Sequence, residues 1–177
     1  ELGNVTVDEL LSLASSGEKN SDIDSIIPDY KGLEAYKNDG GYAALNRINS
    51  GEIAFDGIIA ILKESGLRGL GGAGFPANMK WGFVKGYEGP RYMTINGDEG
   101  EPGTFKDRYY LERNPHAMFE GALIAAHFVE AEKVYIYMRD EYPAVLEILR
   151  REIAAIEAAG LCKPGFLELR RGAGAYI

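Results

Sequence analysis

Glycines are concentrated in residues 66–83, whose sequence is GLRGLGGAGFPANMKWGF. An ordered glycine costs about 0.5–1 kcal/mol more than an alanine, because it loses more backbone freedom on folding. A chain that orders several glycines together exposes backbone that a ligand can approach closely. Phe75, Lys80 and Phe83 lie in or just after this run and offer aromatic faces for stacking and one cation. The combination indicates a site for a flat, phosphorylated ligand.

The same stretch contains the spacing G-x-G-x-x-G over residues 69–74, which matches the fingerprint of dinucleotide-binding folds. That fingerprint follows a β-strand. Here the preceding residues, from Asp56 as a cap to Gly66 as a stop, predict a short buried helix instead. We therefore interpret the run as a non-standard glycine loop. A loop that only turns the chain is the alternative.

A second cluster, NGDEGEPGTFKD over residues 96–107, places Asp98, Glu99 and Glu101 among three glycines. Carboxylates accept hydrogen bonds from sugar hydroxyls and ring N–H groups, and Asn96 can both donate and accept. The cluster is predicted to bind the polar part of a nucleotide-like ligand. Two alternatives stay open, a solvated acidic turn and a divalent-cation loop, although the ligand order of a calcium loop is absent.

Hydrophobic patterning predicts the elements that position these clusters. Three segments rich in β-branched and aromatic residues predict strands: 91–96, 133–138 and 166–169. Two helices are predicted between them, over 115–129 after Asn114 and over 141–159. This alternation predicts an α/β fold with an open, mostly parallel sheet and flanking helices, which is Rossmann-like apart from its glycine loop.

Ligands of open α/β sheets bind at the carboxyl ends of the strands. We therefore expect residues 96–103 and 139–142 to share one edge of the sheet. Residues 1–64 are predicted to form an irregular arm with helices, the first of which begins near Thr6.

The other reactive side chains are expected to be structural. His127 lies in the apolar segment 115–129 and is predicted to be a hydrogen-bonded core residue. Tyr109 and Tyr110 are predicted to pack in the interior, and Cys162 to be an inert thiol in a turn. Hydrolytic triads find little support, because the chain has only two histidines and no nucleophile in a recognised elbow.

Composition excludes several function classes. The formal charge of −8 argues against nucleic acid as a partner, since binding phosphate chains needs clustered Lys and Arg. The single Cys162 allows neither an internal disulfide nor a thiolate-held iron–sulfur cluster within these residues. No apolar run approaches the roughly 20 residues that span a bilayer, and no secretory signal begins the sequence. We expect a cytoplasmic protein without direct membrane insertion.

The motifs together resemble a known family. GLRGLGGAGFPANMKWGF, NGDEGEPGTFKDRYYLERNPHAMFEGALIAA, YIYMRDEYPAV and RRGAGAYI are similar, in this order, to the flavin-binding subunits of respiratory complex I. The diaphorase subunits of NAD-linked hydrogenases and the beta subunits of NAD-dependent formate dehydrogenases share them. The resemblance runs from about Ser65 to Ile177, and the wording of DEGEPGTFKDRYYLERNP and MRDEYPAV is most similar to the formate dehydrogenase branch.

The resemblance implies an electron-input module that binds FMN, takes a hydride from NADH and passes single electrons to iron–sulfur clusters. It implies that residues 65–177 are the N-terminal part of an FMN- and NADH-binding domain. Iron–sulfur clusters would lie in a missing C-terminal part or in partner subunits, one of which would be catalytic and could hold molybdenum or tungsten. The mechanism implied is ring-to-ring transfer, so no side chain need act as a nucleophile.

The resemblance also implies roles for individual residues. Gly69, Gly71 and Lys80 would contact the flavin, with Asn96, Asp98 and Glu99 on its ring and ribityl side. Phe75 and Phe83 would stack on the nicotinamide nucleotide, and Glu101 would hydrogen-bond to it. Tyr176 would approach the flavin.

Two departures from the family pattern matter. Leu70 stands where most members have Arg, so the contact made by that Arg is absent. The sequence stops at Ile177, whereas the family continues with Cys-Gly-Glu-Glu, a ubiquitin-like domain and a four-cysteine domain. We therefore expect a fragment of a longer subunit that is inactive alone. The competing hypothesis is a non-catalytic assembly piece that packs against a partner subunit without flavin.

Overall fold

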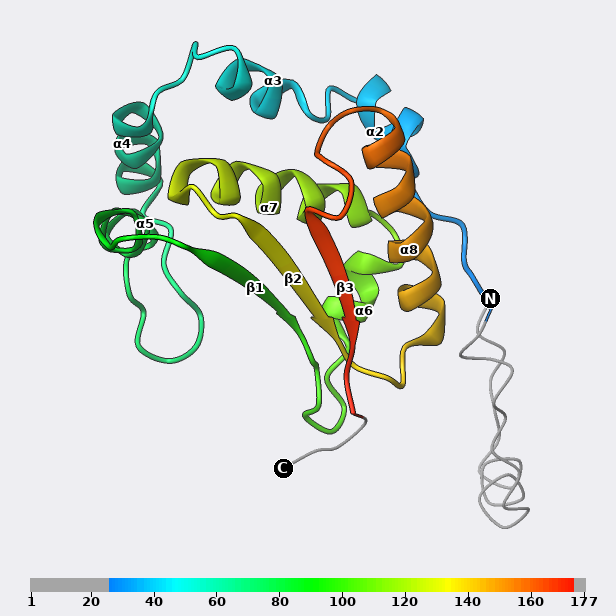
Figure 1. The fold of residues 1–177 in the computed structure, drawn as a ribbon. Coiled ribbons are helices and arrows are strands. Elements are labelled where there is room, and N and C mark those ends of the chain that lie inside the picture. The colour runs from blue at the N-terminus through cyan, green and yellow to red at the C-terminus, as the bar shows by residue number, and fades with distance from the viewer. Residues whose placement is uncertain (1–25, 174–177) are drawn as a thin grey trace, which may run out of the picture.

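The computed structural model describes residues 26–173 and shows an open sheet of three parallel strands in the order β1-β2-β3 (Figure 1). The strands are β1 (Tyr92–Gly97), β2 (Lys133–Met138) and β3 (Leu167–Arg171). The register pairs Tyr92 with Lys133, and Val134 with Leu167. The predicted parallel α/β sheet is confirmed, and the described strands are all parallel.

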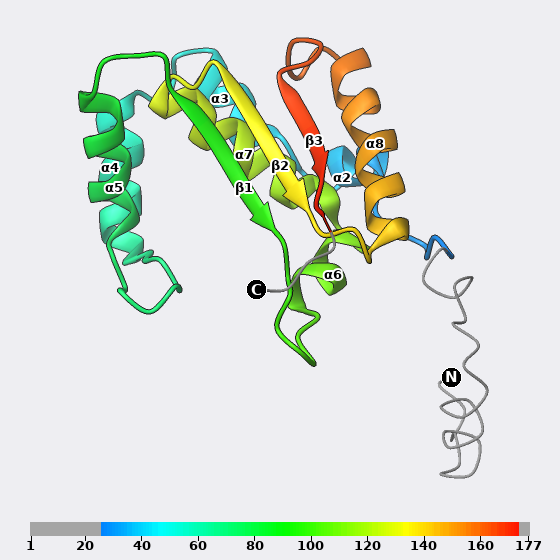
Figure 2. The ribbon, with the colours of Figure 1, turned by 60° about the horizontal axis from the view of Figure 1, so that its bottom comes forward.

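Two long helices cover one face of this sheet. They are α7 (Pro115–Val129) and α8 (Pro143–Ala158); Figure 2 shows α7 behind β1 and β2, and α8 beside β3. Every second residue of β2 is buried against them, beginning at Val134. The core formed there contains large apolar side chains from the helices and the strands, among them Phe119, Leu123, Ile136, Met138, Val145 and Leu149.

The remaining described helices lie around this core. An arm of α2 (Leu33–Asn38) and α3 (Ala43–Asn49) packs on α8 and α7, respectively. A pair formed by α4 (Phe55–Ser65) and α5 (Ala77–Gly86) packs on α7 beyond β1 (Figure 1). The short α6 (Lys106–Leu111) follows β1 and contacts both α7 and α8.

Several local predictions are wrong. None of the residues of α4 is buried, and its N-cap is Ala54, so Asp56 lies in the first turn, where the helix dipole favours an acid. Gly66 does end the helix, at φ 65°. The helix predicted over 141–159 begins instead at Pro143, and α6 was not predicted.

Three side chains expected in the interior lie at the surface. His127, Tyr109 and Tyr110 are exposed, because each falls on the solvent side of its helix. Asn114 occupies the predicted N-cap position of α7 but makes no side-chain capping bond. The helix predicted near Thr6 lies outside the described residues. No helix within residues 26–173 is long and apolar enough to cross a membrane.

Candidate functional site

The two clusters singled out in the sequence lie at the same end of the molecule. The glycine loop (residues 66–76) connects α4 to α5, and the acidic turn (residues 98–105) connects β1 to α6. Figures 1 and 2 both show these connections at the end where the strands have their carboxyl termini. This is the edge at which open α/β sheets bind ligands.

The glycine loop is closed at its base by backbone hydrogen bonds. Arg68 and Pro76 form an isolated antiparallel bridge, and the amide of Gly69 donates to the carbonyl of Phe75 at 2.9 Å. Arg68 Nη1 also donates to the carbonyl of Gly74 at 3.0 Å. The loop therefore has a defined shape and follows a helix, as predicted.

Backbone conformation explains only some of its glycines. Gly72 and Gly74 have φ values of 93° and 60°, in the left-handed region that side chains disfavour. Gly71 lies outside that region, and a Cβ at this position would meet no atom of the described chain within 4 Å. A Cβ at Gly69 would make only an ordinary contact, 3.8 Å from the carbonyl of Phe75. Gly69 and Gly71 thus leave open space, which fits a ligand lying against bare backbone.

Lys80 and Phe83 are carried by α5, a helix that the sequence analysis missed, and Phe75 lies in the glycine loop just before this helix. Phe75 and Phe83 lie with ring centroids 6.2 Å apart, and they are 43% and 57% exposed. Lys80 is exposed on the same helix. Trp81 turns the other way and stacks on Phe128 of α7, which anchors the helix. Two uncovered rings and a cation therefore lie beside the glycine loop.

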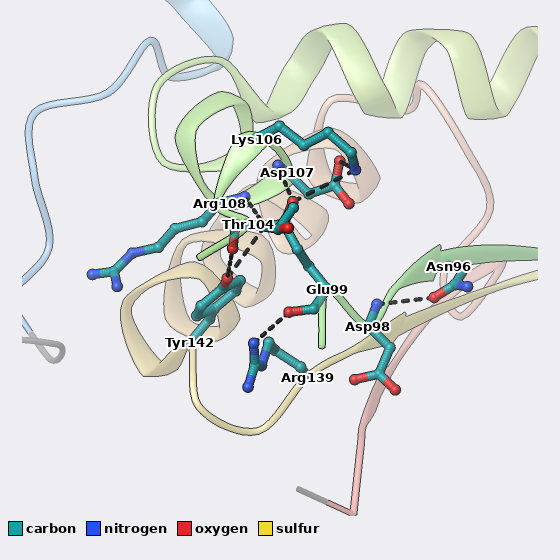
Figure 3. Close-up of polar contacts among 9 residues, drawn as sticks. All are labelled: Asn96, Asp98, Glu99, Thr104, Lys106, Asp107, Arg108, Arg139 and Tyr142. Atoms are coloured by element: carbon teal, nitrogen blue, oxygen red, sulfur yellow. Dashed lines mark hydrogen bonds and ion pairs between the residues drawn. The ribbon is translucent and has the colours of Figure 1, made fainter. Parts of the chain in front are cut away.

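The acidic turn begins with a local side-chain bond. The amide of Asp98 donates to Asn96 Oδ1 at 2.9 Å, which fixes the chain as it leaves β1. Asp98 and Glu101 are exposed. In Figure 3 the Asp98 carboxylate points away from the polar cluster around Glu99. Asp98 and Glu101 are thus the carboxylates of the turn that solvent or a ligand can reach.

Glu99 behaves differently, because its side chain is only 2% exposed. Its carboxylate accepts hydrogen bonds from the amides of Asp107 and Arg108, at 3.0 and 3.3 Å, in the first turn of α6 (Figure 3). Burial raises the pKa of Glu99, but these bonds, one from Tyr142 and the charge of Lys106 outweigh it and lower the pKa below 4.5. Glu99 is therefore an ionised carboxylate held by protein groups.

The loop after β2 reaches the same turn. Arg139 Nη1 donates to the backbone carbonyl of Glu99, and the Tyr142 hydroxyl lies 3.2 Å from Glu99 Oε2. This confirms the prediction that residues 96–103 and 139–142 share an edge. The sequence analysis did not single out Arg139 or Tyr142; their position after a predicted strand was the available signal.

The site residues thus fall into two groups on separate elements. Small pockets lie at each: one of about 190 Å³ beside the glycine loop, lined in part by Arg68 and Asn78, and one of about 170 Å³ lined in part by Asn96 and Asp107. Tyr176 lies outside the described residues. Leu70, at the position where the resemblance predicts an Arg, is 99% exposed in the glycine loop.

The described residues give no support to the divalent-cation alternative for the acidic turn. Within residues 26–173, there is no group of three or more His, Cys, Asp or Glu side chains that could hold a metal ion. Glu99 turns into the protein, whereas Asp98 points away from it (Figure 3). Cys162 is half-buried, and burial raises its pKa to about 11, so its thiol is protonated at neutral pH.

Comparisons with known proteins match this chain to components of NADH-quinone oxidoreductases. It is 44% identical over 160 residues to an NADH-quinone oxidoreductase subunit of Rhizobium meliloti, covering 85% of this chain and 38% of that protein. It is 43% identical over 158 residues to an NADH-quinone oxidoreductase subunit of Aquifex aeolicus, covering 85% and 37%. The chain thus spans less than two fifths of the length of these curated relatives.

A solved structure shares the fold. The crystal structure of an NAD+-reducing NiFe hydrogenase in the air-oxidised state superposes with a TM-score of 0.62 at 43% identity, covering 70% of this chain and 21% of that one. The family model described as the Nuo51 FMN-binding domain matches residues 62–177, a span that includes both the glycine loop and the acidic turn. The chain belongs to the Nuo51 FMN-binding domain family.

Proposed function

We propose that this chain is the N-terminal part of an electron-input flavoprotein module that binds FMN and exchanges electrons with NADH. The observation that carries the proposal is the space left at Gly69 and Gly71. Neither a left-handed backbone nor packing within the described chain requires glycine there. A flat ligand against the loop accounts for both glycines and for the cost of ordering them.

The residues that would hold the flavin come from both groups. The glycine loop offers bare backbone, and Lys80 supplies a positive charge that favours an anionic group on the ligand. Asn96 and Asp98 stand at the end of β1, where they can hydrogen-bond to hydroxyls or to ring N–H groups. FMN, when bound, supplies the two-electron chemistry with nicotinamide and the one-electron chemistry with iron–sulfur clusters.

The nicotinamide nucleotide is assigned to the exposed aromatic side. Phe75 and Phe83 present uncovered rings for stacking, and the carboxylate of Glu101 is free to accept hydrogen bonds from sugar hydroxyls. The chain's contribution is then to orient two rings and to exclude water between them. Glu99 differs from its neighbours, because its buried carboxylate is held by amides; its role is to shape the turn.

We propose that the parent complex is an NAD-dependent formate dehydrogenase of the cytoplasm. The proposal rests on the amino-acid sequences of MRDEYPAV and of residues 98–115, which are most similar to that branch of the family. The relatives named above are quinone oxidoreductase subunits and a hydrogenase, so an activity assay must distinguish a formate dehydrogenase from these two kinds of complex. The purified complex is expected to reduce NAD with formate, and its partner subunits to hold iron–sulfur clusters and molybdenum or tungsten. Reduction by hydrogen alone, or NADH oxidation coupled only to quinone, would reassign it.

The flavin proposal is tested at Gly71 in the complete subunit. The wild-type subunit is expected to show a flavin absorption spectrum that NADH bleaches. Gly71→Ala leaves the backbone unstrained but puts a methyl group where the ligand would lie, so FMN should bind about tenfold more weakly, since overpacking costs about 1–3 kcal/mol. The FMN dissociation constant is measured by quenching of flavin fluorescence.

Gly121→Ala is the matched control, because Gly121 lies on the exposed side of α7 and its Cβ would also meet no atom within 4 Å. It should leave FMN affinity unchanged. A colourless wild-type subunit that does not respond to NADH would contradict the proposal and favour the assembly hypothesis. If Gly71→Ala and Gly121→Ala bind FMN with equal affinity, the glycine loop is not part of the FMN site.

A further inference from the structure

Two residues of the loop between β2 and α8 hydrogen-bond to the acidic turn. Arg139, the first residue after β2, donates to the backbone carbonyl of Glu99. Tyr142, the residue before α8, places its hydroxyl 3.2 Å from Glu99 Oε2 and 3.4 Å from the carbonyl of Thr104. The loop between β2 and α8 therefore holds both the main chain and the side chain of Glu99 (Figure 3).

The two donors, Arg139 and Tyr142, are themselves held in place by contacts with each other and with neighbouring side chains. The Arg139 guanidinium lies over the Tyr142 ring, 5.0 Å from its centroid, and pairs with Glu141 at 3.1 Å. Arg108 lies 5.3 Å from the centroid of the same ring. Tyr142 is only 7% exposed. These contacts fix the two donors before any ligand binds.

The contacts of Glu99 set what its neighbours can do. The chain turns tightly at Glu99, where the amide of Gly100 donates to the carbonyl of Asp98 at 3.1 Å. The Glu99 carboxylate lies among its protein donors on one side of this turn, and the Asp98 carboxylate points away from them (Figure 3). We propose that Arg139 and Tyr142 are positioning residues, which hold the acidic turn so that Asp98 and Glu101 face the ligand. The inference rests on the proposed function, because it concerns the same site.

The test uses the complete flavin subunit and compares Arg139→Gln, Arg139→Lys and Tyr142→Phe with the wild type. Tyr142→Phe removes only the hydroxyl and keeps the ring. We expect Arg139→Gln and Tyr142→Phe each to weaken FMN binding about tenfold, the scale of a lost hydrogen bond to a charged group. Arg139→Lys, which keeps one charged donor, should recover part of the affinity. Arg150→Gln, an exposed arginine of α8 paired with Glu147 at 3.8 Å, is the matched control and should bind FMN normally.

A double-mutant cycle separates positioning from a general loss of stability. If Arg139 acts through the turn, Asp98→Asn should cost less affinity in the Arg139→Gln background than in the wild type, because Asp98 is already misplaced there. If Asp98→Asn lowers FMN affinity as much in the Arg139→Gln background as in the wild type, the inference is overturned. FMN affinities within twofold of wild type in both Arg139→Gln and Tyr142→Phe would also overturn it. A wild-type subunit that binds no FMN would instead refute the proposed function itself. If Arg139→Gln does not fold, the same cycle is run with Tyr142→Phe.

Discussion

At the scale of single residues, the acidic turn shows how one residue type takes on different roles. Asp98 and Glu101 are exposed carboxylates, whereas Glu99 is buried and accepts bonds from the amides of Asp107 and Arg108. These amides belong to the first turn of α6, where the helix has unpaired donors and a positive dipole end. Glu99 therefore does for α6 what an N-cap does for other helices.

Glu99→Gln is expected to destabilise the chain. The amide side chain can still accept a hydrogen bond, but it lacks the charge that strengthens bonds to α6, so the free energy of unfolding at pH 7 should fall by about 1–3 kcal/mol. The pKa of Glu99 is lower in the folded chain than its ordinary 4.5. The stabilisation is therefore complete above that value and is lost as pH falls through the folded-state pKa.

Urea unfolding of wild type and variant at several pH values measures this difference. The gap between the two should close as the pH is lowered below about 4.5. Glu147→Gln is the control, because the Glu147 side chain on α8 is 42% exposed and pairs with Arg151 at the surface, and it should change stability by less than about 0.5 kcal/mol. A gap of equal size at all pH values would show that the charge of Glu99 plays no part.

Sequence alone could not separate the three acids of this turn. Asp98, Glu99 and Glu101 have similar chemistry, and all three were assigned to ligands. Their difference arises from contacts with Arg139 and Tyr142, which are distant in sequence by about 40 residues. The alternation of strand and helix predicted that these segments meet, but side-chain direction depends on packing that periodicity does not encode.

At the scale of elements, the N-terminal arm is held by one buried carboxylate of α8. Glu152 accepts hydrogen bonds from Tyr30, at 2.8 Å, and from the amide of Leu33, at 3.2 Å. His116 Nε2 lies 2.7 Å from the same carboxylate, and its Nδ1 lies 2.8 Å from the Tyr42 hydroxyl. Burial lowers the pKa of His116, so the ring is neutral at pH 7 and donates from Nε2 to Glu152 while it accepts from Tyr42.

Glu152→Ala is expected to loosen this arm. Removing the carboxylate leaves the donors of Leu33 and His116 without their acceptor in the interior, which should cost about 3 kcal/mol of stability. Amide hydrogen exchange of Leu33 should accelerate accordingly. Glu152→Gln keeps one acceptor oxygen and should have a smaller effect. Unchanged exchange in α2 after Glu152→Ala would mean that apolar packing alone holds the arm.

The elements themselves were predictable where the periodicity is strong. The strands and α7 appear close to their predicted bounds, because β-branched runs and an Asn-Pro start are strong local signals. The helix α5 was missed, because Gly82 and the neighbouring aromatic residues Trp81 and Phe83 weaken its helical signal. The exposure of α4 could not be predicted from its apolar residues, since burial depends on which helices pack beside it.

At the scale of the whole molecule, the two parts of the candidate site stand on units that differ in packing. The acidic turn leaves from β1 and is tied to α6 and to the β2–α8 loop, against the buried core. The glycine loop stands on α4 and α5, neither of which has a buried residue. This pair is attached to the core through Trp81 on Phe128 and through Lys85 with Glu130. Few buried contacts predict low local stability.

A ligand that bridges the two parts should therefore stabilise them unequally. In the complete subunit without flavin, we expect amides of α4 and α5 to exchange faster than those of α7 and β2. Adding FMN should slow exchange most in residues 66–86, because binding stabilises the conformation that makes contact with the ligand. Hydrogen–deuterium exchange followed by mass spectrometry measures both states. Protection that rises only around the acidic turn would place the ligand on the core alone, and it would leave the space at Gly69 and Gly71 without an occupant.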